Sequence, residues 1–189
     1  PMVDNAVLRV AWGQAGSEPG PYYMTDVFSS GSVSDGWGPE LTYTYDGAGG
    51  FTTSSTQANA DIKPEIATET EMGIDLAMFN NKVTVELTSY DIKTTDAILN
   101  QPLAPSTGYG GRLANAAKME NKGIEAVLGV RVLDTKNLSF DVDFKYAANE
   151  NKVTDLAGAE YISLGGFSSA GAVAMEGKPY GVFRVGSWA

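Results

Sequence analysis

The fold is decided by the stretch Glu69-Thr-Glu-Met-Gly-Ile-Asp-Leu-Ala-Met-Phe79, the dipeptide Asn80-Asn81, and the stretch from Lys82 to Ile92. In both stretches, apolar residues occupy every second position, and mostly polar or small residues stand between them. Alternation with period two is the pattern of a β-strand that has one apolar and one polar face. Asparagine tolerates the left-handed backbone of tight turns, so the three pieces together predict an antiparallel hairpin.

The same alternation recurs along the chain, whereas helical periodicity is weak. It predicts five strands, at about residues 6–14, 69–79, 82–92, 123–133 and 138–148. These segments are longer than an average soluble strand and match the ~9 to 11 residues that a tilted strand needs to cross a bilayer. The class is therefore all-β, and the strand length favours a membrane. No run of apolar residues is long enough for a membrane-spanning helix.

The connections between the expected strands alternate between short and long. Residues 80–81 and 134–137 make short turns, whereas residues 15–68, 93–122 and 149–189 are expected to be long loops. Short turns on one side and long loops on the other are typical of an antiparallel transmembrane β-barrel with extracellular loops. The apolar face would then meet lipid, and the charged face would line a wet lumen. Tyr90 departs from this pattern, so either a β-bulge shifts the phase there or its ring faces the lumen.

Alternating faces also occur in soluble proteins. In a soluble or surface-attached β-sandwich the apolar face would pack against a second sheet, and such a module could bind glycans through its aromatic loops. Five or six strands are too few to close a membrane barrel of at least ~8. If the membrane interpretation holds, the chain is expected to be a portion of a larger barrel.

Composition excludes several kinds of chemistry. The 189 residues contain no cysteine and no histidine, which removes thiol nucleophiles, imidazole bases and the usual transition-metal ligands. The formal net charge of −10 disfavours nucleic acid as a partner. A carboxylate-based hydrolase remains conceivable, but acids such as Glu71 and Glu125 are more simply charges of a solvated wall. We expect no catalytic residue, no cofactor and no metal site.

Several consecutive stretches resemble a known family. They are Ile62-Lys-Pro-Glu-Ile-Ala-Thr-Glu-Thr-Glu-Met-Gly-Ile-Asp-Leu76, Phe79-Asn-Asn-Lys-Val-Thr-Val-Glu-Leu-Thr-Ser-Tyr90 with Thr94-Thr-Asp-Ala-Ile-Leu99, and Asn115-Ala-Ala-Lys-Met-Glu-Asn-Lys-Gly-Ile-Glu125, flanked by Leu8-Arg-Val-Ala-Trp-Gly-Gln-Ala-Gly16 and Glu176-Gly-Lys-Pro-Tyr-Gly181. In this order they resemble the later barrel region of SusC/RagA-type TonB-linked outer-membrane transporters of Bacteroidetes.

The resemblance implies a barrel of ~22 strands, the size class of the plugged transporters. It also implies a plug domain, TonB as the energy-coupling partner through parts of the protein outside this chain, and a SusD-like surface lipoprotein over the mouth. The implied function is nutrient import across the bacterial outer membrane, of oligosaccharides or peptides, by a protein that is not an enzyme.

Residues of the expected loops are the candidates for ligand binding. Aromatic rings offer flat apolar area at little entropic cost, which suits sugars or a protein partner, although internal loop packing explains the same residues. Glycines beside such rings let the backbone approach a ligand. The candidates are Trp37, Tyr109, Arg112, Tyr161 and Phe167.

Overall fold

The computed structural model describes residues 2–34, 36–42, 44–45, 48–167 and 170–186. The chain divides into two compact units. Unit 1 comprises Pro1–Gly16, Ile66–Thr95 and Ala117–Ala189, and unit 2 comprises Ser17–Glu65 and Asp96–Ala116. Within the described residues, no helix is long and apolar enough to span a membrane.

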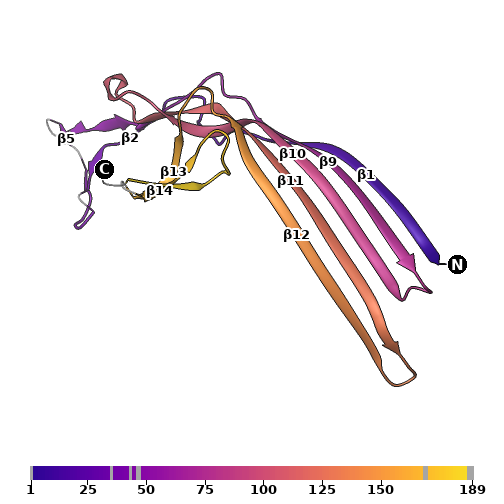
Figure 1. Cartoon of the computed structure of the whole chain (residues 1–189). Coiled ribbons are helices and arrows are strands. Elements are labelled where there is room, and N and C mark those ends of the chain that lie inside the picture. The colour runs from indigo at the N-terminus through magenta and orange to yellow at the C-terminus, as the bar shows by residue number, and fades with distance from the viewer. Residues whose placement is uncertain (1, 35, 43, 46–47, 168–169, 187–189) are drawn as a thin grey trace. The chain divides into compact units, whose positions relative to one another are not determined.

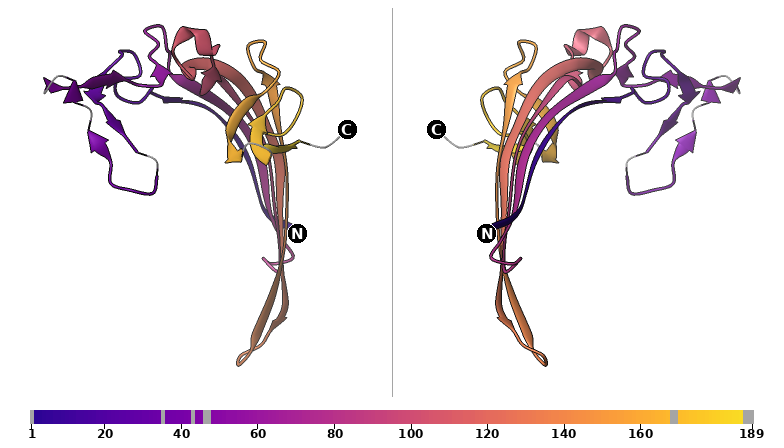
Figure 2. Two further views of the ribbon diagram at one scale, coloured as in Figure 1. Left: turned by 90° about the vertical axis from the view of Figure 1, so that its left-hand side faces the viewer. Right: turned by 90° about the vertical axis from the view of Figure 1, so that its right-hand side faces the viewer.

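One long antiparallel sheet dominates unit 1. Its strands are β1 (Val3–Ser17), β9 (Glu65–Met78), β10 (Val83–Pro102), β11 (Gly111–Asp134) and β12 (Ser139–Asp155). They are paired in the order β1-β9-β10-β11-β12, and Figures 1 and 2 show them side by side. This confirms the all-β prediction, and the two outermost strands leave the sheet open at both edges, as a portion of a larger barrel would.

Two short turns join neighbouring long strands. Between β9 and β10, Phe79, Asn80 and Asn81 all adopt positive φ, from 57° to 59°. Two of the three are asparagines, which adopt this conformation more readily than most residues. Between β11 and β12, the Thr135 backbone N–H donates to the Leu138 carbonyl at 2.9 Å. The asparagine-rich and aspartate-led stretches therefore turn where the sequence predicts.

The strands are longer than predicted. The expected loop 93–122 is mostly strand, because β10 runs to Pro102 and β11 starts at Gly111, with only a short 3-10 turn, η1 (Pro105–Thr107), among the connecting residues. The reason is chemical. From Lys118 to Lys122 both faces of β11 carry polar residues, so the hydrophobic alternation fades while the backbone pairing continues.

The other two expected loops also contain strands. Residues 149–155 continue β12, and a small sheet follows, formed by β13 (Ile162–Phe167), β14 (Ala170–Ala174) and β15 (Val182–Val185). Residues 168–169 and 187–189 of that expected loop lie outside the described residues. Buried apolar side chains gather at the end of β12 and in β13 and β14: Val153, Leu156, Ile162, Val173 and Ala174.

Unit 2 consists of short strands and connecting segments. Its strands are β2 (Phe28–Ser30), β3 (Ser32–Val33), β4 (Leu41–Thr42), β5 (Thr44–Tyr45), β6 (Ala48–Gly49), β7 (Phe51–Thr53) and β8 (Thr56–Gln57), together with the ends of β10 and β11. The pairs are β2 with β7, β3 with β4, and β5 with β6. Strand β8 runs parallel to β11, where Gly111 lies opposite Thr56 and Arg112 opposite Gln57.

Candidate functional site

The long sheet of unit 1 has one apolar face that stays uncovered. Its large side chains are exposed or half-buried: Leu8 and Val10 on β1, Met72 on β9, Leu87 on β10, Ile124 and Leu128 on β11, and Phe140, Phe144 and Tyr146 on β12. We call this set the apolar band. Leu8 is 76% exposed and Phe144 61%, so no second layer of this unit packs on them. The β-sandwich alternative needed such a layer, and the exposure of the band contradicts it.

The height of the apolar band fits a membrane. On β12 the apolar face runs from Phe140, or from Leu138 just before the strand, to Ala148. At ~3.3 Å per residue and a strand tilt of ~40°, that length of chain spans about 25 Å along the barrel axis, which is the height of the lipid-facing band of outer-membrane barrels.

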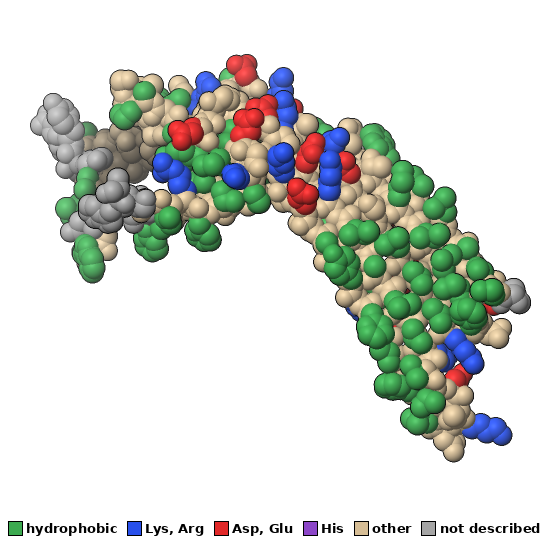
Figure 3. Space-filling model, viewed as in Figure 1, with side chains coloured by type: hydrophobic (Ala, Val, Ile, Leu, Met, Phe, Trp, Pro, Cys, Tyr) green, Lys and Arg blue, Asp and Glu red, His purple; other side chains and the backbone are tan. Residues whose placement is uncertain are grey.

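Charged side chains replace apolar ones further along the same face. We call them the charged belt: Asp91 and Lys93 on β10, Lys118, Glu120 and Lys122 on β11, and Glu150, Lys152 and Asp155 on β12. The Lys122 ammonium lies 3.2 Å from the Glu120 carboxylate and 3.8 Å from that of Asp91. Figure 3 shows hydrophobic side chains gathered over one part of the strands and charged ones gathered beyond them.

An ion pair closes one end of the charged belt. The Lys118 ammonium donates a hydrogen bond of 2.9 Å to the Asp155 carboxylate, which also accepts one from the Ala157 backbone N–H. Both contacts favour the ionised carboxylate and so lower the pKa of Asp155, with the Lys118 hydrogen bond as the larger cause.

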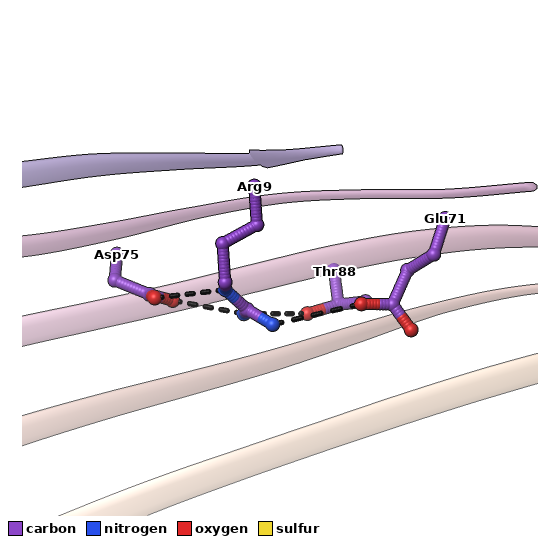
Figure 4. A network of polar contacts seen from close by, with 4 residues as sticks. All are labelled: Arg9, Glu71, Asp75 and Thr88. Atoms are coloured by element: carbon purple, nitrogen blue, oxygen red, sulfur yellow. Dashed lines mark hydrogen bonds and ion pairs between the residues drawn. The ribbon is translucent and has the colours of Figure 1, made fainter. Parts of the chain in front are cut away.

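The opposite face of the sheet is polar and internally paired. Figure 4 shows Arg9 of β1 between two carboxylates of β9. The guanidinium lies 2.9 Å from Asp75 and 3.5 Å from Glu71, and it also donates to the Thr88 hydroxyl on β10. Further along, Arg131 of β11 lies 2.8 Å from Asp141 of β12. These arrangements hold neighbouring strands together across a wet face and form no catalytic pair.

Tyr90 lies on this polar face. The register between β9 and β10 is continuous, with Tyr90 opposite Glu71, so no bulge shifts the phase there. The Tyr90 hydroxyl accepts a hydrogen bond from the Asn149 side-chain amide, and its ring passes directly over Gly123. The lumen-facing alternative is therefore the correct one.

Unit 2 contains a pocket that the sequence interpretation missed. Its volume is about 460 Å³, and it is lined by Tyr22 and Tyr23, polar side chains such as Asp26, Gln57 and Asn100, and the apolar Leu113. The signal in the sequence was the adjacent pair of tyrosines after Pro19-Gly20-Pro21. Within the described residues, no three acidic side chains come close enough to hold a metal ion.

Three of the predicted ligand-binding residues belong to unit 2. Trp37 is 96% exposed, between β3 and β4. Tyr109 is half-buried, and its backbone N–H donates to the Thr107 hydroxyl after η1. Arg112 is half-buried at the start of β11, and its Nε is buried without a hydrogen-bond partner among the described residues. None of the three lines the tyrosine pocket.

The other two belong to the small sheet of unit 1. The Tyr161 ring, just before β13, lies under the Arg184 guanidinium of β15 at 4.4 Å from its centroid, a cation–π contact. Phe167 ends β13 and is 86% exposed. The five residues are thus divided between the two units, and Tyr161 already has an internal partner.

Comparison with known proteins adds the family. Residues 2–181 match the model of the family described as TonB dependent receptor-like, beta-barrel. The chain is 31% identical over 107 residues to TonB-dependent receptor P26 of Formosa agariphila, and 26% identical over 127 residues to TonB-dependent receptor SusC of Bacteroides thetaiotaomicron. These matches cover 57% and 64% of this chain but only 11% and 13% of the relatives, so the chain spans about an eighth of their length.

A solved structure has the same fold. The structure titled "Structure of the RagAB peptide transporter" superposes with a TM-score of 0.76 and 20% sequence identity, over 95% of this chain and 18% of that one. The family match spans nearly all of the described residues, and the open sheet with one exposed apolar face is what a section of a barrel wall requires. The chain belongs to the family of TonB-dependent receptor-like β-barrels.

Proposed function

We propose that this chain is a section of the barrel wall, with its loops, of a SusC-like TonB-dependent importer in the bacterial outer membrane. The observation that carries the proposal is the apolar band, which is exposed, about 25 Å high by strand geometry, and bounded by charges. An exposed apolar surface of this extent needs an apolar partner, and lipid supplies one on all sides of a closed barrel.

The transported ligand in this proposal is an oligosaccharide or a peptide. The relatives support this choice by their names: SusC belongs to the same family, and RagAB is described as a peptide transporter. A SusD-like lipoprotein would cover the extracellular mouth, and TonB would act on parts of the protein outside this chain. The segments 15–68, 93–122 and 149–189 are proposed to face the outside, and the turns 80–81 and 134–137 the periplasm.

The exposed aromatic residues provide the test of ligand contact. In cells whose only importer of this type is the full-length protein, uptake of a labelled oligosaccharide or peptide should require a proton gradient and should stop with an uncoupler. Trp37→Ala and Phe167→Ala should lower uptake several-fold at equal surface abundance, because they remove exposed rings. Thr52→Ala, an exposed polar position on β7, is the matched control.

Two results would contradict parts of this proposal. Uptake that continues without a proton gradient would remove TonB-coupled import as the function. Equal uptake by Trp37→Ala, Phe167→Ala and Thr52→Ala would leave import in place but remove these rings from the ligand path.

A further inference from the structure

The most distinctive feature that the proposed function leaves unused is a groove on the apolar side of the sheet. It has a volume of about 630 Å³ and crosses strands β9 to β12 where the apolar band meets the charged belt. Its apolar wall contains Met72, Ile124 and Ala148, and its polar wall contains Asp91, Lys122 and Glu150. Small residues, Ser89 and Ala148, leave the space between the larger side chains.

The charges around this groove alternate in sign from strand to strand. The row that lines the groove reads Asp91, Lys122 and Glu150, because Asp91 forms an ion pair with Lys122, and Lys122 lies opposite Glu150 in the β11–β12 register. The next row of the same face carries the reverse signs: Lys93, Glu120 and Lys152. Adjacent strands are ~4.8 Å apart, so opposite charges are neighbours in both directions.

A pattern of alternating signs has a specific chemical complement. A single anion at Lys122 would also lie beside the carboxylates of Asp91 and Glu150, and a single cation at those carboxylates would lie beside Lys122. A group that carries a phosphate and an ammonium on a short linker avoids both conflicts, because each end meets the opposite charge. The apolar wall is continuous with the apolar band, which suits an acyl chain attached to that group.

We propose that this groove binds a membrane lipid with a phosphoethanolamine-type headgroup, its phosphate at Lys122, its ammonium between Asp91 and Glu150, and an acyl chain along Met72 and Ile124. The inference rests on the proposed function, because it needs the apolar band to face lipid. It goes beyond that function in assigning a headgroup preference to one place on the wall.

The experiment measures lipid retention by the purified full-length protein. The protein is titrated in detergent with phosphatidylethanolamine or with phosphatidylglycerol of the same acyl chains, and bound lipids are counted by native mass spectrometry. We expect several-fold preference for phosphatidylethanolamine. Lys122→Met should reduce retention of phosphatidylethanolamine several-fold, whereas Lys145→Met, on the polar face of β12, should not change it.

A conservative variant provides a second measurement. Glu150→Gln keeps the size of the side chain and removes one of the two negative charges at the ammonium end, so it should shift the preference toward phosphatidylglycerol. Wild-type protein that retains both lipids equally, or a Glu150→Gln variant with unchanged preference, would overturn the headgroup assignment alone. Protein that retains neither lipid and fails to float with vesicles would overturn the lipid-facing wall itself.

Discussion

Arg9 and Asp75 form a two-point contact between strands β1 and β9, with the guanidinium Nε at 2.9 Å from one carboxylate oxygen and Nη2 at 3.0 Å from the other. The planar fork of arginine matches the two oxygens of a carboxylate, which fixes the register of the two strands on the polar face. Glu71 stands 3.5 Å away on the same guanidinium, so removal of Arg9 leaves two carboxylates without their cation.

The first prediction follows from this geometry. Because both side chains are substantially exposed to solvent, the pair contributes little at high salt. In a double-mutant cycle with Arg9→Met and Asp75→Asn, unfolding of the full-length protein in detergent should reveal a favourable coupling at low salt that shrinks as sodium chloride is raised. A coupling that does not change with salt would mean that shape, and not charge, joins the strands.

The second prediction concerns the two faces of β11. Leu128 lies within the apolar band opposite Phe144, and Glu125 lies on the polar face. Leu128→Arg should destabilise the barrel in a bilayer by about 2 to 4 kcal/mol, the usual range for a cation near the bilayer midplane. Glu125→Arg should cost much less. Equal losses in denaturant titrations of vesicle-inserted protein would refute the assignment of the faces.

The third prediction tests the contact of Tyr90 with Gly123. A Cβ at position 123 would lie 2.3 Å from the ring and hydroxyl of Tyr90, so Gly123→Ala must push the ring aside and break its hydrogen bond with Asn149. The ring can swing because its far end makes the contact, so we expect a loss of about 1 kcal/mol.

The control for this prediction is another strand glycine. Gly13 on β1 has no atom within 4 Å of a notional Cβ, so Gly13→Ala should be close to neutral. The combination Gly123→Ala with Tyr90→Ala should relieve the clash and behave as Tyr90→Ala alone. Equal stability of the Gly123→Ala and Gly13→Ala proteins would indicate that the ring lies elsewhere.

The fourth prediction concerns pH. The pKa of Asp155 is lowered in the folded state by the Lys118 hydrogen bond first and by the Ala157 backbone N–H second. A carboxyl with a lower pKa when folded than when unfolded stabilises the fold above its unfolded pKa of ~3.9, and this stabilisation is lost as the pH falls through the folded value.

Carboxyl-labelled aspartate measures this directly. In a ¹³C titration of the full-length protein, Lys118→Met should move the pKa of Asp155 upward, because the main cause of the shift is removed. Lys136→Met, in the turn between β11 and β12, should leave the pKa of Asp155 unchanged. An unchanged value in Lys118→Met would show that the backbone N–H alone holds the carboxylate.

The alternation in residues 69–79, 82–92, 123–133 and 138–148 was sufficient to predict the strands, their two faces and the two short turns. Local alternation works here because one face is apolar over its whole height, and the periodicity of side chains follows from the backbone alone. The same rule fails from Lys93 to Pro102 and from Gly111 to Lys122, where polar residues occupy both faces and only pairing with neighbouring strands keeps the chain extended.

The sequence by itself determined the class of fold, the composition of each face and the absence of cysteine and histidine chemistry. Only the tertiary structure decided which charges meet. Arg9 finds Asp75, Lys122 finds Asp91, and Tyr22 and Tyr23 join Asn100 around one pocket, although these residues are far apart in the sequence. Such contacts depend on strand order and register, which arise from pairing between distant segments and leave no periodic signal in the sequence.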